Sequence, residues 1–94
     1  MKVQHRHHKN KGQFYIEIDG ETKAEMTYSM AGEEKMIIDH TEVDAGLKGQ
    51  GIGYKLVETA VQYARENHIK IVPLCPFANA VFKKKSEYHD VLHK

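Results

Sequence analysis

The chain has 94 residues, of which 40% are hydrophobic and 29% are charged, with seven glycines and two prolines. A chain of this length buries a single core, and this composition is that of a globular protein. A second domain and intrinsic disorder are therefore excluded, and residues 1–94 are expected to form one domain. Fourteen Lys and Arg against thirteen Asp and Glu leave a net charge of +1, which gives no strong attraction for nucleic acid or for an anionic membrane.

The cysteine count and the apolar pattern indicate the compartment. Cys75 is the single cysteine, so no internal disulfide can form, which is usual for proteins of a reducing interior. The polar start of the chain lacks the apolar segment of a signal peptide, and no apolar run is long enough to cross a membrane. We therefore expect a cytoplasmic protein.

The first half of the chain predicts antiparallel strands. After a polar, His-rich start, residues 13–18 partly alternate between apolar and polar, and Asp19-Gly20 is typical of a two-residue hairpin turn. Residues 24–30 alternate with period two, and after a turn residues 35–43 form a further predicted strand. Three or four antiparallel strands are expected in sequence order.

The second half of the chain predicts a helix, a strand and a second helix. Apolar residues recur at helical spacing from Ile52 to about Asn67, at Ile52, Leu56, Val57, Ala60, Val61 and Ala64. Residues 69–74 form a short β-branched run, and Pro76 suits the first position of a helix that is followed by a last turn over 86–92. Strand, helix and strand in this order predict a parallel pair, so we expect an α/β fold with a mixed, mostly antiparallel sheet, a central helix and a short C-terminal helix.

A glycine-rich loop precedes the central helix. Lys48-Gly49-Gln50-Gly51-Ile52-Gly53 lies where the first amides of the helix have no helical partner, and glycines there let an anion approach the backbone. Lys48 and Lys55 can add flanking charge. The spacing fits neither a dinucleotide fingerprint nor a P-loop, and three glycines alone are also compatible with a simple tight turn.

Together with its surroundings, the loop resembles the acetyl-CoA loop of the Gcn5-related N-acetyltransferases, with Lys48 where that family has Arg or Gln. Further matches are His40-Thr41-Glu42-Val43, Leu74-Cys75-Pro76-Phe77 and Ser86-Glu87-Tyr88, which resemble the short, single-domain branch of the family over residues 12–92. The resemblance implies an acetyl-CoA-dependent N-acetyltransferase with an unidentified amine acceptor, and it implies that the acceptor-binding walls of larger members are missing.

The resemblance also implies the ligand contacts. The pyrophosphate of coenzyme A is expected on the amides of Gly49, Gln50, Gly51, Ile52 and Gly53. The pantetheine arm is expected along the strand end at Thr41, Glu42 and Val43, in a gap where the two parallel strands diverge.

Cys75 and His40 are the candidate catalytic residues. Because Pro76 favours the first helical position, Cys75 is expected at the helix cap, where amides and the helix dipole stabilise a thiolate. His40 is expected to reach the same gap and to act as a base, either on Cys75 carrying the acetyl group or through water on the amine. The alternatives are a buried filler at Cys75, a hydrogen-bonded strand residue at His40 and Glu42 as a weaker base.

The histidines near the start of the chain do not indicate a metal site. His5, His7 and His8 lack the spacing and partners of a zinc site, so no metal is expected. Lys83, Lys84 and Lys85 suit a helix C-terminus but could also contact the coenzyme A 3′-phosphate.

The chain could instead be a non-catalytic coenzyme A-binding module or a protein-interaction adaptor with an exposed sheet edge. A monomer or a weak homodimer is expected.

Overall fold

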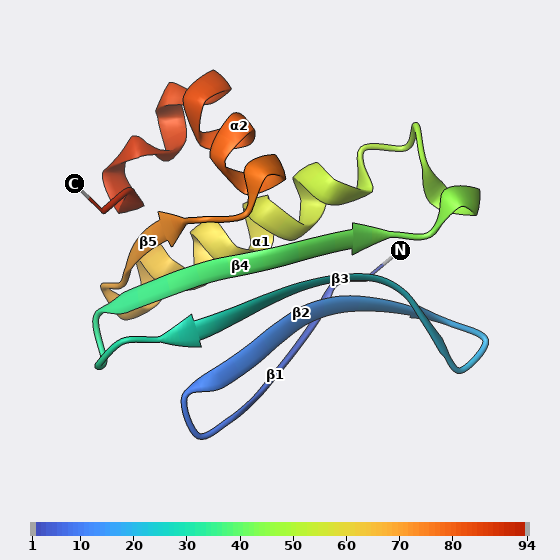
Figure 1. The fold of residues 1–94 in the computed structure, drawn as a ribbon, viewed down its shortest axis with the longest axis horizontal. Helices are drawn as coiled ribbons and strands as arrows, with labels where there is room; N and C mark the ends of the chain where they lie inside the picture. The colour runs from blue at the N-terminus through green and yellow to red at the C-terminus, as the bar shows by residue number, and fades with distance from the viewer. Residues whose placement is uncertain (1, 94) are drawn as a thin grey trace.

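The computed structural model describes residues 2–93 as one five-stranded sheet with helices packed on it. The strands lie side by side in sequence order, β1 to β5 (Figure 1). Their bounds are Gln4–His8 (β1), Lys11–Ile18 (β2), Glu21–Met30 (β3), Lys35–Val43 (β4) and Lys70–Pro73 (β5). The helices are η1 (Ala45–Leu47), α1 (Ile52–Asn67), α2 (Pro76–Lys84) and η2 (Ser86–Val91), where η denotes a 3-10 helix.

The antiparallel part of the sheet confirms the predicted hairpin. Asp19 and Gly20 connect β2 to β3 with φ values of 52° and 81°, the left-handed pair that matches the twist of two adjoining strands. The His-rich start also forms a strand, and β1 pairs with β2 from Gln4↔Tyr15 to His8↔Lys11. Four consecutive antiparallel strands therefore precede the first helix.

The core lies between one face of the sheet and the two helices. The apolar positions predicted for α1 are all buried and meet even-numbered residues of β3, such as Met26 and Tyr28. Phe82 and Val81 of α2 belong to the same cluster. Figure 1 shows α1 running alongside β4, with α2 and the C-terminal turns gathered at the β5 edge.

The parallel pair β4–β5 confirms the predicted strand, helix and strand unit. Its register runs from Lys35↔Lys70 to Ile38↔Pro73, and α1 makes the connection. His68 ends α1 with a left-handed φ of 56°, and its neighbour Ile69 donates to the Ala64 carbonyl at 2.9 Å. The mixed, mostly antiparallel sheet with one parallel pair is the predicted fold class.

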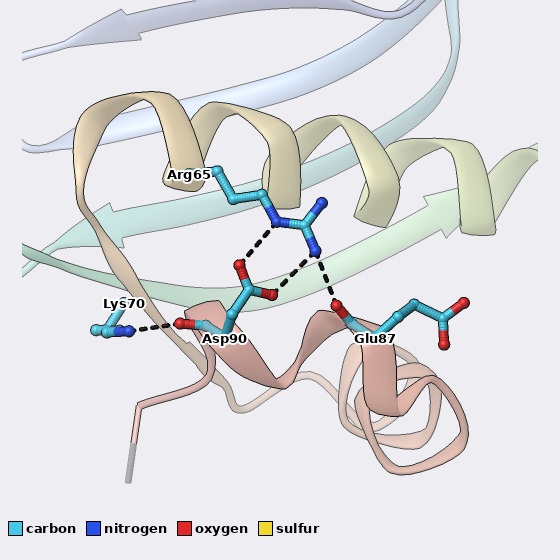
Figure 2. A network of polar contacts seen from close by, with 4 residues as sticks. All are labelled: Arg65, Lys70, Glu87 and Asp90. Carbon is cyan, nitrogen blue, oxygen red and sulfur yellow. Dashed lines mark hydrogen bonds and ion pairs between the residues drawn. The ribbon is translucent and has the colours of Figure 1, made fainter.

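The C-terminal segment is tied down by polar contacts (Figure 2). Arg65 of α1 donates to both carboxylate oxygens of Asp90, from Nε at 2.8 Å and from a terminal nitrogen at 2.9 Å, and also to the Glu87 carbonyl at 2.8 Å. Lys70 Nζ donates to the Asp90 carbonyl at 2.5 Å. Val91 is the buried residue of η2, and Tyr88 and the following Leu92 are partly buried against the core.

The second face of the sheet is polar. Cross-strand partners such as Thr27 and His40, or Glu25 and Glu42, lie on it, while the alternate residues of the same strands face the helices. We call this the outer face. No helix within residues 2–93 has the length and apolar character needed to span a membrane.

Candidate active site

The glycine-rich loop joins β4 to α1 and leaves backbone amides free. Gly49 and Gly51 take left-handed φ values of 84° and 71°, and a Cβ at either position would meet nothing within 4 Å, so the loop surface is open to a ligand. The first helical hydrogen bond runs from the Lys55 amide to the Gly51 carbonyl at 3.1 Å. The amides just before Lys55 therefore have no helical acceptor and form the positive end of α1.

A hollow of about 710 Å³ lies against this loop and the end of β4. It brings together most of the residues predicted to hold coenzyme A, namely Thr41, Glu42, Val43, Lys48, Gly49, Gly51, Ile52 and Gly53. The other two predicted contacts, Gln50 and Lys55, are exposed and are not among its lining residues. Two segments predicted separately thus form one concave surface.

The end of β4 is open on the side of β5. The paired register stops at Ile38↔Pro73, where the amides of Leu74 and Cys75 both donate to the Ile38 carbonyl at 3.0 Å. β4 continues to Val43 while the chain after β5 turns into α2. Because the Asp44 amide donates to the Lys23 carbonyl of β3 at 2.8 Å, the neighbouring Val43 amide points the other way, toward the open edge.

Cys75 lies at the N-cap of α2, as predicted, with Pro76 in the first helical position. The side chain is 5% exposed, and its thiol donates to Thr41 Oγ1 at 3.3 Å. Burial raises the pKa of Cys75, but hydrogen bonds that the thiolate accepts from the Thr41 hydroxyl and from the amides of Ala78, Phe77 and Thr41 outweigh burial and hold the pKa below its usual value. The site therefore stabilises the thiolate relative to that of an ordinary cysteine.

His40 and Cys75 lie on opposite faces of the sheet, so each side chain would have to reach the expected gap from its own face. A bulge causes the difference: Tyr28 pairs with Ile38 but Thr27 pairs with His40, so Asp39 is an extra residue in β4. From this point the alternation of β4 is reversed. His40 lies on the outer face and is exposed, whereas Thr41 faces the helices and contacts Cys75.

Tyr54 and Phe77 are lining residues that the sequence reasoning did not assign to the site. Their rings meet edge to face with centroids 5.8 Å apart. Phe77 also explains Gly53, because a Cβ there would lie 2.5 Å from Phe77 Cζ. Gly53 therefore allows the two helices to pack closely beside the loop, a requirement that depends on contacts between residues distant in sequence.

A second hollow of about 770 Å³ lies at the opposite end of the sheet, lined by residues including His7, Tyr28 and Tyr63. It contains none of the predicted site residues. Next to it, His5 stacks on Phe14 at 4.2 Å, and its Nε2 lies 2.6 Å from the Tyr28 hydroxyl. Over residues 2–93 no group of three or more His, Cys, Asp or Glu side chains is placed to hold a metal ion.

Comparison with known proteins identifies the class to which this fold and site belong. Residues 13–91 match the family described as GCN5-related N-acetyl-transferase. A GCN5-like N-acetyltransferase of Staphylococcus aureus, solved by NMR in solution, is 36% identical, with a TM-score of 0.71 over 96% of this chain and 87% of that one. This chain belongs to the GCN5-related N-acetyltransferase family, which confirms the expected family, fold and enzyme class.

More distant structures show the same fold. The ribosomal-protein-alanine N-acetyltransferase of Brucella melitensis biovar Abortus 2308 is 17% identical, with a TM-score of 0.68 over 82% of this chain and 62% of that one. A family acetyltransferase of Elizabethkingia anophelis, solved with acetyl-CoA bound, is 16% identical, with a TM-score of 0.60 over 82% of this chain and 53% of that one. Acetyl-CoA is the acyl donor of the family. No curated protein sequence matches this chain significantly.

Proposed function

We propose that this chain transfers the acetyl group of acetyl-CoA to an amine, with the pyrophosphate bound by the amides of residues 49–53. The observation that carries the proposal is the single hollow that the loop shares with Thr41, Glu42 and Val43 at the end of β4. A helix N-terminus with free amides suits a diphosphate, and an unpaired strand edge suits the amide groups of a pantetheine arm. These two features adjoin in the order in which coenzyme A carries the two groups.

In this proposal, a backbone amide at the open edge of β4 stabilises the negative charge that develops during the reaction. The amine nitrogen attacks the thioester carbonyl carbon, and the Val43 amide donates to the carbonyl oxygen as negative charge develops on it. The carbon–sulfur bond then breaks, and the coenzyme A thiolate leaves and takes up a proton. A thioester in the opening lies between the two faces of the sheet, so groups on both faces can reach it.

His40 and Cys75 take separate roles from opposite faces. His40 accepts the proton of an amine that approaches from the exposed outer face, directly or through water. Cys75 meets the thioester from the helix side beside Thr41. In a covalent route its thiolate attacks the carbonyl carbon, coenzyme A leaves, and the amine then takes the acetyl group from the cysteine sulfur.

The rival proposal is a module that binds coenzyme A without turning it over. The exposure of His40 on the outer face favours this rival, because an exposed side chain does not enclose an acceptor amine. The lone free thiol of Cys75 supports a reducing compartment for either function, and we propose the cytoplasm.

Paired measurements of turnover and binding test the proposal. Thiol release from acetyl-CoA in the presence of a mixture of amines should fall roughly 100-fold in His40→Ala, which removes a general base, while coenzyme A affinity measured by calorimetry stays the same. Coenzyme A at a hundred times its dissociation constant should raise stability by about 2.7 kcal/mol. Binding without any turnover in the wild type would favour the module.

Mass spectrometry separates the two chemical routes. Intact protein incubated with acetyl-CoA should gain the mass of one acetyl group in the covalent route, and the adduct should disappear in Cys75→Ala. An unmodified wild type that still turns over supports direct transfer.

A further inference from the structure

Lys85 is the member of the lysine run 83–85 that contacts α1. Lys83 and Lys84 are exposed, whereas Lys85 is half-buried, and its Nζ lies 5.9 Å from the centre of the Tyr54 ring. Tyr54 lies in the first turn of α1, directly after the glycine-rich loop. A cation from the far end of α2 is therefore held beside the loop, where a free lysine side chain would otherwise sample many rotamers.

The Tyr54 ring is positioned by α2 and remains accessible. Phe77 of α2 meets it edge to face, and Lys85, which caps the C-terminus of α2, lies over it, so both side chains turn toward α1. Tyr54 is nevertheless 37% exposed. The ring and the ammonium group thus form a small platform, Tyr54–Lys85, at the edge of the hollow that contains the loop.

The direction in which coenzyme A crosses the loop would bring its adenosine toward this platform. Coenzyme A is linear, with pantetheine on one side of the pyrophosphate and a 3′-phosphorylated adenosine on the other. If pantetheine follows β4 from the loop, adenosine leaves the loop on the opposite side. Lys48 lies on the β4 side, since it also lines a hollow with Ala24, Val43 and Asp44, whereas Tyr54 and Lys85 lie where α1 meets α2.

We propose that Lys85, held over the Tyr54 ring, binds the 3′-phosphate of coenzyme A and makes this protein select coenzyme A over dephospho-coenzyme A. The inference rests on the proposed function, because it needs the pyrophosphate on residues 49–53. The 3′-phosphate carries negative charge, and the lysine ammonium group binds it as a compact positive charge. The aromatic ring beneath the ammonium group offers a surface on which the adenosine can stack.

Calorimetric titration with coenzyme A and dephospho-coenzyme A tests the inference. The wild type should bind coenzyme A about fivefold more tightly than the dephospho form, the size expected for one partly exposed ion pair, and the ratio should shrink as salt is added. Lys85→Gln should bring the ratio close to one by weakening coenzyme A alone. Lys85→Arg and Lys84→Gln should both keep it, since the first retains the charge and the second removes the same charge from an exposed position.

The outcomes separate this inference from the proposed function. Equal affinity of the wild type for both ligands, or a preference that Lys85→Gln keeps, overturns the role of Lys85 and leaves the coenzyme A site intact. Loss of the preference in Lys84→Gln would assign the phosphate contact to Lys84 and would also overturn the inference. Failure of both ligands to bind overturns the coenzyme A site and the inference together.

Discussion

Thr41 is one of the residues that lower the pKa of the Cys75 thiol. Its hydroxyl oxygen lies 3.3 Å from Cys75 Sγ, and its amide joins those of Phe77 and Ala78 in stabilising a negative charge on the sulfur. Thr41 also lines the hollow beside the glycine-rich loop. One residue therefore connects the proposed thioester position to the thiol.

Thr41→Val tests this connection at constant side-chain shape. Loss of one hydrogen bond to the thiolate should raise the pKa of Cys75 by roughly half to one pH unit. Since Cys75 is the single cysteine, the thiolate absorbance in the ultraviolet reports it directly once the Cys75→Ser spectrum is subtracted. Thr41→Ser should titrate like the wild type. A Thr41→Val curve that overlays the wild type would show that the hydroxyl does not affect ionisation.

Local pattern was sufficient to predict the elements, but not the side of the sheet on which His40 lies. The apolar spacing of α1 and the turn at Asp19-Gly20 are properties of short segments, so the sequence alone predicted them. The extra residue Asp39 arises from the pairing of β4 with β3, whose residues are distant in the chain. The Asp39 carboxylate accepts a hydrogen bond from Thr27 Oγ1 at 2.5 Å on that outer face. No local sequence pattern predicts this contact.

The candidate site divides in the same way. Free amides at the start of α1 follow from the position of the glycines between a strand and a helix, whereas the prediction of a coenzyme A loop also needed the resemblance of the surrounding motifs to the family. Tyr54 and Phe77 enter the site because α2 folds back on α1. No local pattern indicates this contact, because it joins residues that are distant in the chain.

Gly51→Ala tests the loop as an element. Gly51 is the N-cap of α1 at a φ of 71°, and Gly20 has a similar φ of 81° in the β2–β3 turn. An alanine at either position should cost about 1 kcal/mol of stability in chemical denaturation, because the left-handed region is strained for a residue with a Cβ. Only Gly51→Ala should also weaken coenzyme A binding. Equal coenzyme A affinities of Gly51→Ala and Gly20→Ala would show that the loop does not contact coenzyme A.

At the scale of the whole molecule, the two hollows lie at opposite ends of one sheet. The hollow with the glycine-rich loop lies at the end of β4, whereas β1 and the turn between β3 and β4 border the second hollow. Near that second hollow the edge strand β1 is fastened by His5, which stacks on Phe14 and hydrogen-bonds with Tyr28. Gly12 makes room for the Tyr28 ring, since a Cβ there would lie 2.1 Å from Tyr28 Cζ.

This arrangement makes the stability of the molecule depend on pH through His5. Burial, and secondarily the charge of His7, lowers the pKa of His5 below its ordinary value of 6.5. The unfolded chain therefore binds the proton more tightly than the folded protein. The contribution to stability is fully present above pH 6.5 and is lost as the pH falls from there toward the folded-state pKa of His5.

Denaturation between about pH 7.5 and about pH 5 should reveal this loss, because one titrating group can change stability by at most about 1.4 kcal/mol per pH unit. The carboxylates with lowered pKa values, Glu21 and Asp90, titrate below this window, from ordinary values of 4.5 and 3.8. His5→Phe keeps an aromatic ring on Phe14 without a titrating group, so its stability should fall less steeply with acid than that of the wild type. The exposed His8 serves as the matched control, and His8→Gln should retain the wild-type slope. If His5→Phe retains the full slope, the acid sensitivity arises elsewhere and β1 is not fastened by a neutral His5.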